Sequence, residues 1–266
     1  MSWITARRRH PAAGYAIVLL GLVLVGVVYA AALGHGAAAA GAPPGYSKQD
    51  VAQGRDLFET TCATCHGMNA EGSSRGPSLI GVGAAAVDFQ VSTGRMPAKE
   101  EGAQVQQKPR TLDAAQTRAL AAYIASLGGG PAVPSAAEVN TSGANVGLGQ
   151  QIFVAECAQC HNFSGAGGAL TYGKFAPALT TATPTQIYEA MLTGPQSMPV
   201  FNDTTITPSE KRDIIRYVTQ TRSEPNPGGF SLGRVGPVTE GLVGWLLGLG
   251  LVIVAAMWIT AKQREQ

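Results

Sequence analysis

The four cysteines of this chain all fall in two Cys-x-x-Cys-His motifs, at residues 62–66 and 157–161. This spacing is the attachment signature of c-type haem, in which two thiols from one helical turn add to the haem vinyl groups and the adjacent histidine binds the iron. A disulfide oxidoreductase pair or a zinc site could use the same thiols. A disulfide pair leaves the histidines unexplained, however, and no βαβ pattern accompanies the motifs. We therefore predict two covalently attached haem c groups, held by Cys62, Cys65, His66, Cys157, Cys160 and His161.

Two methionines occupy matching positions downstream of the motifs, and each is followed by proline. Met96 lies 30 residues after His66, and Met198 lies 37 residues after His161. A residue before proline favours extended backbone, so a loop at this point can bring a thioether over the distal face of a haem. An electron-transfer haem of this kind takes a sixth ligand, and Met/His ligation raises its potential. We predict that Met96 and Met198 bind the iron opposite the two histidines.

Two prolines, Pro77 and Pro177, lie in equivalent stretches between the motifs and the methionines. We expect each to present its backbone carbonyl to the Nδ1–H of the motif histidine, His66 or His161. Such a contact fixes the ring of a ligating histidine. The alternative role for both prolines is an ordinary turn.

The elements that position these residues occur twice, because the middle of the chain is a repeat. Residues 54–66 align with residues 149–161 at a constant offset of 95. Each copy is predicted to close with a helix, at residues 113–127 and at residues 207–221. Residues 207–210 read Thr-Pro-Ser-Glu, which is a capping box with proline at the first helical position. Strand signals are weak throughout, so we predict an all-α fold.

The composition of the chain points to membrane segments and away from nucleic-acid binding. Charged residues make up only 14% of the chain, against roughly 25% in an average soluble domain. Residues 48–240 carry 14 basic and 16 acidic side chains. A nucleic-acid-binding protein would be expected to show a basic stripe, which this nearly neutral segment lacks.

The C-terminal apolar run, residues 241–261, has 21 residues without a charge and is followed by Lys262 and Arg264. About 20 helical residues span the roughly 30 Å hydrocarbon core of a bilayer. Trp245 and Trp258 lie near its two ends, as interfacial residues do. A buried core helix is the alternative, but the length, flanks and terminal position favour a transmembrane anchor.

The N-terminal apolar run, residues 12–33, has 22 uncharged residues and follows Arg7–Arg9. A positive segment, an apolar segment and the later Ala37–Ala40 stretch also describe a cleavable signal peptide. The run exceeds the usual ~7–15 apolar residues of such a peptide, which favours a retained helix. Because basic flanks stay inside, we expect residues 45–240 on the extracytoplasmic face of the cell membrane.

With these motifs the chain resembles class I c-type cytochrome domains in two places, residues 46–126 and 145–222. Tandem haem domains followed by a C-terminal anchor also resemble the dihaem cytochrome c subunit of the actinobacterial menaquinol–cytochrome c reductase, the cytochrome bcc complex. The stretches that carry this second resemblance are residues 76–83, 89–97, 190–199 and 227–230.

The resemblance implies that the chain takes electrons from a Rieske iron–sulfur protein, beside cytochrome b, and passes them to an aa3-type cytochrome c oxidase. Quinol oxidation would belong to the partner subunits, so the chain would be part of an enzyme without a catalytic residue of its own. One alternative is a dihaem electron-transfer subunit of another oxidase or dehydrogenase. Another is a dihaem peroxidase, against which the two equivalent methionines argue. We expect electrons to enter at the second haem domain, next to the anchor, and to leave from the first, which a linker lets project.

The predicted chain thus has two tandem cytochrome c-like domains between a C-terminal transmembrane helix and an N-terminal transmembrane helix or signal peptide. We refer to the two domains as the first repeat and the second repeat. The predicted boundaries are 1–44 for the N-terminal segment, 46–127 for the first repeat, 128–146 for the linker, 147–223 for the second repeat, 224–240 for the connector, 241–261 for the transmembrane helix and 262–266 for a cytoplasmic tail.

Overall fold

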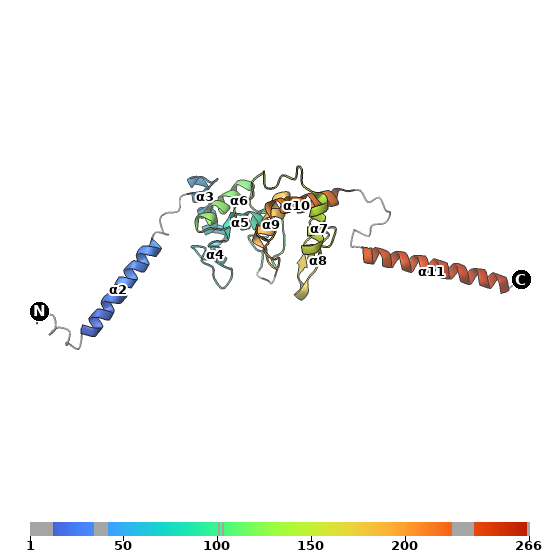
Figure 1. The fold of residues 1–266 in the computed structure, drawn as a ribbon, viewed down its shortest axis with the longest axis horizontal. Helices are drawn as coiled ribbons and strands as arrows, with labels where there is room; N and C mark the ends of the chain where they lie inside the picture. Colours follow the sequence, from blue (N-terminus) through green and yellow to red (C-terminus); the bar gives the residue numbers. More distant parts are fainter. Residues whose placement is uncertain (1–12, 35–41, 101, 103, 225–236, 265–266) are drawn as a thin grey trace, which may run out of the picture. The chain divides into compact units, whose positions relative to one another are not determined.

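The computed structural model describes residues 13–34, 42–100, 102, 104–224 and 237–264 (Figure 1). The chain divides into two compact units, residues 1–48 and residues 49–266, and each is described by itself. Some predicted features lie outside the described residues, namely Arg7–Arg9, Ala37–Ala40 and residues 225–236 of the connector.

The two terminal apolar segments are helical. The N-terminal unit holds α2 (Ala13–Gly34), which covers the predicted apolar run. The helix α11 (Pro237–Arg264) has 28 residues and contains the predicted run at 241–261. Among the described residues, one helix is long and apolar enough to cross a membrane, Gly241–Arg264, with a mean hydropathy of 2.4.

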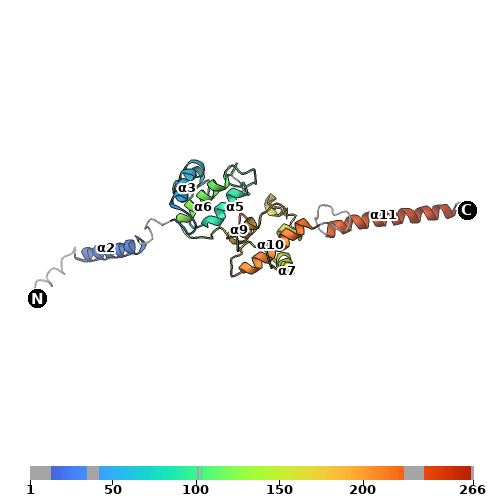
Figure 2. The ribbon, with the colours of Figure 1, turned by 90° about the horizontal axis from the view of Figure 1, so that it is seen from above.

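The two repeats are built from the same helices in the same order, which confirms the predicted mostly helical pair of domains (Figures 1 and 2). Each has a long first helix, a one-turn helix that carries the Cys-x-x-Cys-His motif, a middle helix and a closing helix. In the first repeat these are α3 (Lys48–Thr61), α4 (Ala63–His66), α5 (Gly83–Ser92) and α6 (Ala114–Ser126). In the second repeat they are α7 (Val146–Glu156), α8 (Ala158–His161), α9 (Pro184–Thr193) and α10 (Pro208–Ser223).

The closing helices begin at side chains that bind the free N–H groups of the first turn. In α10 the Thr207 hydroxyl accepts a hydrogen bond from the Glu210 N–H, and the Glu210 carboxylate accepts one from the Thr207 N–H at 2.7 Å. This confirms the predicted capping box. Asp113 and Gln116 form the same reciprocal pair at the start of α6. Both helices are thus fixed locally by their own sequence.

The first and closing helices of each repeat cross at a glycine, where the two backbones come into contact. A Cβ atom on Gly54 would lie 1.9 Å from the Ala119 carbonyl oxygen, and one on Gly149 would lie 2.0 Å from that of Asp213. No side chain fits at either position, because real Cβ contacts under 3.0 Å are essentially absent. The equivalent crossings explain why the first helix of each repeat has a glycine one turn before its phenylalanine.

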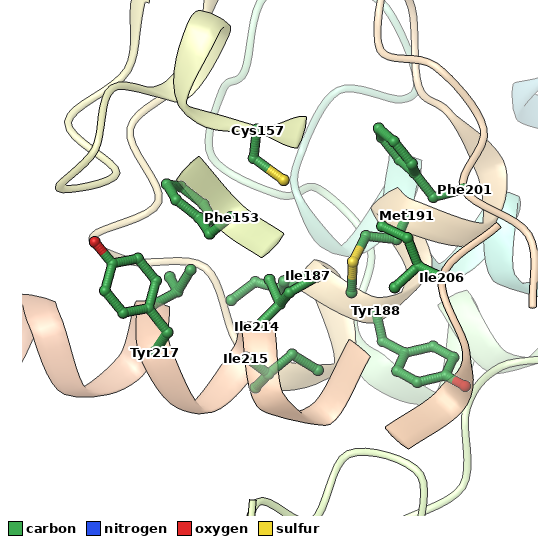
Figure 3. Packing of buried hydrophobic residues seen from close by; sticks show 11 residues of the cluster. Phe153, Cys157, Ile187, Tyr188, Met191, Phe201, Ile206, Ile214, Ile215 and Tyr217 are labelled. Carbon is green, nitrogen blue, oxygen red and sulfur yellow. The ribbon is translucent and has the colours of Figure 1, made fainter. Parts of the chain in front are cut away.

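An aromatic pair lies next to each crossing and forms part of the core. The ring centroids of Phe58 and Tyr123 are 5.3 Å apart, and those of Phe153 and Tyr217 are also 5.3 Å apart. Such tilted pairs stabilise a core beyond the area they bury. We call the buried cluster Phe58, Ala63, Ala70, Val91, Leu120, Tyr123 and Ile124 the first core. The second core, shown in Figure 3, comprises Phe153, Cys157, Ile187, Tyr188, Met191, Phe201, Ile206, Ile214, Ile215, Tyr217 and Val218.

The second repeat contains a small hairpin that the weak strand signals did not predict. The strands β1 (Gly168–Ala169) and β2 (Phe175–Ala176) pair antiparallel around the short helix η1 (Thr171–Gly173). They occupy the stretch between histidine and proline, where the proline follows the histidine by 16 positions in the second repeat and by 11 in the first. The extra residues fold back on themselves, so the proline still returns to the histidine.

The repeats contact each other along their middle helices, α5 and α9 (Figure 2). The Gln186 amide donates to the Ser92 hydroxyl at 3.3 Å across this contact. Elsewhere, the Gln104 amide pairs with the backbone of Phe175 in both directions, at 2.6 and 2.9 Å. The first repeat is therefore held against the second, whereas the length of the linker had predicted a domain free to project.

Candidate haem attachment sites

Both Cys-x-x-Cys-His motifs fold into the same single turn of helix. The N–H of the second cysteine donates to the carbonyl of the first at 3.1 Å, from Cys65 to Cys62 and from Cys160 to Cys157. The histidine N–H bonds the carbonyl of the first cysteine at 3.0 Å in both copies. This turn presents two thiols and an imidazole from five consecutive residues, as attachment to two vinyl groups and one iron requires.

The four cysteine thiols are free, and two of them, Cys62 and Cys157, lie against the apolar cores. Burial, with a smaller effect of Glu156 and Cys160, raises the pKa of Cys157 to about 12. Burial also raises the pKa of Cys62. Because zinc binds the thiolate form, the raised pKa values of Cys62 and Cys157 favour thioether attachment. Among the described residues, moreover, no three His, Cys, Asp or Glu side chains gather into a metal-binding group.

Each motif histidine is held at one ring nitrogen. The Nδ1–H of His66 donates to the Pro77 carbonyl at 2.8 Å, and that of His161 donates to the Pro177 carbonyl at 3.0 Å. This arrangement leaves Nε2 as the nitrogen for a metal. Burial lowers the pKa of His161, against the opposing effect of the Pro177 carbonyl. A neutral imidazole with a fixed ring is the form that binds iron.

The loop between histidine and proline is shaped in both repeats by a glycine that the sequence analysis missed. The Gly72 N–H donates to the His66 carbonyl at 2.7 Å, and the Gly167 N–H donates to the His161 carbonyl at 2.9 Å. Both glycines have positive φ, 91° and 83°. A Cβ on either would collide with the backbone just after the proline. Their shared offset of 95, the same as that of the motifs, was the signal that could have revealed them.

The two methionines follow the middle helices and pack against the cores. Met96 is half-buried against the first core, which Cys62 also contacts. Met198 is half-buried against the second core, which includes Cys157. Figure 3 shows the Cys157 thiol among the apolar side chains of this cluster. Each apolar cluster is thus bordered by a predicted attachment cysteine and a predicted methionine ligand, while iron binding by the methionines stays a prediction.

These features together fit a covalent haem in each repeat. Two free thiols come from one turn, the histidine ring is held at Nδ1, and a thioether lies at the apolar cluster that the first thiol also contacts. An apolar cluster of this kind also suits the largely apolar haem ring, which adds to the core of a domain with fewer than 90 residues.

Comparisons with known proteins agree with this reading of the two repeats. Residues 51–128 match the family described as "Cytochrome c", and residues 144–218 match "Cytochrome C oxidase, cbb3-type, subunit III". The chain is 42% identical to the cytochrome bc1 complex cytochrome c subunit of Corynebacterium diphtheriae over 280 residues, covering 97% of this chain and 98% of that one. It is 48% identical to the same subunit of Corynebacterium efficiens, covering 80% and 77% of the two chains. Identity to the Mycobacterium leprae subunit is 49%, covering 79% and 74%.

Proposed function

The chain belongs to the family of cytochrome bc1 complex cytochrome c subunits, and from this membership we propose that it conducts electrons through two covalently bound haems. It is a membrane-bound electron-transfer cytochrome with covalent haem c, and it works with the other subunits of its complex. The number of haems, their ligands, the donor and the acceptor are the parts that we propose.

The observation that carries the proposal is that one site geometry occurs twice. His66 and His161 each donate from Nδ1 to a proline carbonyl, and each follows two free cysteines on a single turn. We assign Cys62, Cys65, Cys157 and Cys160 to thioether bonds and the two histidines to the proximal side of iron. Met96 and Met198 would supply the second iron ligands, and Pro77 and Pro177 would orient the histidine rings.

A bound haem would supply a one-electron couple, and the chain sets the conditions under which that couple works. Cysteine attachment prevents loss of the cofactor, and the apolar clusters limit access of water to it. A thioether ligand favours the reduced state and therefore raises the potential. The proline carbonyls hold the imidazole rings in one orientation. The roles that we assign to these side chains are attachment, ligation and orientation, which are the roles of a conduit within an enzyme.

The donor we propose is the Rieske iron–sulfur subunit, beside cytochrome b, and the acceptor is an aa3-type oxidase. We place electron entry at the second repeat, because only 13 residues separate α10 from the membrane-length helix α11. Electrons would then leave from the first repeat. Lys262 and Arg264 at the end of α11 favour a cytoplasmic C-terminus, so both repeats would lie on the extracytoplasmic face.

Rapid mixing of the purified complex with menaquinol tests this order. The Met198→Leu variant should slow reduction of the first repeat, because its electrons would arrive through the second. The Met96→Leu variant should leave reduction of the second repeat at the native rate and slow only the transfer to the oxidase. Native-rate reduction of the first repeat in the Met198→Leu complex would contradict the order.

A second function has a specific observation in its favour, because the second repeat matches a cbb3-type oxidase subunit. In that case the chain would serve as a dihaem electron-input subunit of an oxidase. Extraction of membranes in mild detergent separates the two functions. Our proposal expects co-purification with cytochrome b and the Rieske subunit, whereas the alternative expects an oxidase without them.

A further inference from the structure

The contact between the two repeats contains a buried acidic pair. Asp88 lies on α5 and Glu189 lies on α9, the two middle helices that pack against each other. The side chain of Glu189 is completely buried, and that of Asp88 is half-buried. An isolated ionised carboxylate is among the most costly groups to bury in a protein. This pair therefore needs a physical explanation that the haem sites do not provide.

The Glu189 carboxyl lacks a donor from the rest of the protein. Among the described residues, neither of its oxygens accepts a hydrogen bond from an N–H or O–H group. The group close enough to interact with it is the Asp88 carboxyl. Two ionised carboxylates can only accept hydrogen bonds, so they would repel each other in this position. A proton on one of them turns the repulsion into a hydrogen bond.

The electrostatics place that proton on Glu189. Burial, together with the charge and the hydrogen bond of Asp88, raises the pKa of Glu189 to about 10. Burial also raises the pKa of Asp88, while its hydrogen bond with Glu189 lowers it. Opposite effects of one hydrogen bond are expected when Glu189 is the donor and Asp88 is the ionised acceptor.

Four other charged groups on or near the elements around this contact have partners of their own. On α10, which also packs on α9, Lys211 donates to the Asp203 carboxylate at 2.7 Å and to the Ile206 carbonyl at 2.8 Å. Asp213 accepts from the Asn145 N–H at 2.7 Å. On the side of the first repeat, Arg118 of α6 lies 4.0 Å from Asp50, and the Arg95 guanidinium lies over the Phe89 ring. The two carboxyls are the charged side chains that α5 and α9 themselves bring to their contact.

We propose that Asp88 and Glu189 share one proton and that this proton holds the two repeats in contact. Loss of the proton to solvent would leave two like charges in the interface and favour its opening. The shared proton and its effect on the contact do not depend on the proposed function. What rests on the proposed function is the consequence that pH controls electron passage from one repeat to the other.

The direction of the pH effect follows from the raised pKa. A carboxyl that holds its proton when the interface is closed and loses it when the interface opens makes opening easier as pH rises. The closed interface loses stability with rising pH from the ordinary glutamate pKa of 4.5 up to the raised pKa of about 10. With one proton involved, the equilibrium constant for opening rises up to about tenfold per pH unit within this window.

Infrared difference spectroscopy of the full-length, haem-loaded protein tests the shared proton. The wild type should show the C=O stretch of a protonated carboxyl at pH 8, and this band should disappear as the pH passes 10. Glu189→Gln should lack the band, and Asp56→Asn, which changes an exposed carboxyl on α3, should retain it. A wild-type protein without the band, or a band that persists in Glu189→Gln, would overturn the proposal.

Hydrogen exchange of α5 and α9 tests the effect on the interface. Between pH 6 and pH 8, the protection of these helices in the wild type should fall by up to about 100-fold after correction for intrinsic exchange. Glu189→Gln keeps the shape and supplies an N–H donor to Asp88, so its protection should stay nearly constant. An equal fall in wild type and Glu189→Gln would refute the proposed role. Haem counted on the same samples keeps this test apart from the proposed function, because a single haem would contradict the conduit without affecting the carboxyl result.

Discussion

At the scale of single residues, the two sites depend on a hydrogen bond to the backbone at each histidine. The bond from His66 or His161 reaches a proline carbonyl, which a side-chain substitution does not remove. The ligand on the opposite side is a side chain and can be changed without disturbing this contact. The methionines therefore give the more direct test of iron ligation.

Met96→Leu and Met198→Leu should each remove about half of the methionine–iron charge-transfer absorption of the oxidised protein. Leucine has a similar volume and no sulfur, so the apolar packing is largely kept. This absorption is measured on the purified protein, where the visible spectrum meets the near infrared. Met68→Leu changes an exposed methionine next to the first motif and is the matched control. An unchanged band in either variant would show that its methionine is not a ligand.

At the scale of helices, the local signals and the long-range contacts differ in how well the sequence predicts them. The capping box at Thr207 was predicted because its four residues are consecutive. The crossing at Gly149 was not, although the alignment marked this glycine, because the Asp213 carbonyl that excludes a Cβ lies far along the chain. The hairpin at residues 168–176 was missed because two-residue strands leave no periodic pattern.

Gly149→Ala should destabilise the second repeat by about 1–3 kcal/mol, the usual cost of forcing extra atoms into a packed contact. Its Cβ would lie 2.0 Å from the Asp213 carbonyl oxygen, so the two helices would have to separate. Gly147→Ala is the matched control on the same helix, because its Cβ meets nothing closer than 3.5 Å. Thermal unfolding of the haem-loaded protein should show a lower midpoint for Gly149→Ala alone. Equal midpoints for the two variants would mean that the close crossing is not important.

The helix α11 should act as the membrane anchor of the protein. Its residues 241–261 carry no charge, its apolar part is unburied, and the helix is long enough to span a bilayer. A stop codon after Pro237 should therefore release haem-containing protein from the membrane fraction. A stop codon after Arg264 removes only Glu265 and Gln266 and should leave the protein bound. If the shorter chain stays with the complex, docking depends on the N-terminal segment or the repeats.

At the scale of the whole molecule, the repeat itself was the part that the sequence predicted best. Two copies of one motif at a fixed offset imply two copies of one fold, and the cofactor chemistry follows from the cysteines and histidines. The contact between the copies could not be predicted, because a repeat alignment pairs equivalent positions and does not say how the two copies pack against each other. The acidic pair joins Glu189 to Asp88, and only the packing of α5 against α9 brings these residues together.

The central claim is that each copy holds a haem, and the intact mass of the full-length chain under denaturing conditions tests it most directly. Thioether bonds survive denaturation, so the account predicts a chain that carries the mass of two haems. A variant with Cys62→Ala and Cys65→Ala should carry one, retained on the second repeat. A wild-type chain that carries a single haem would contradict the account.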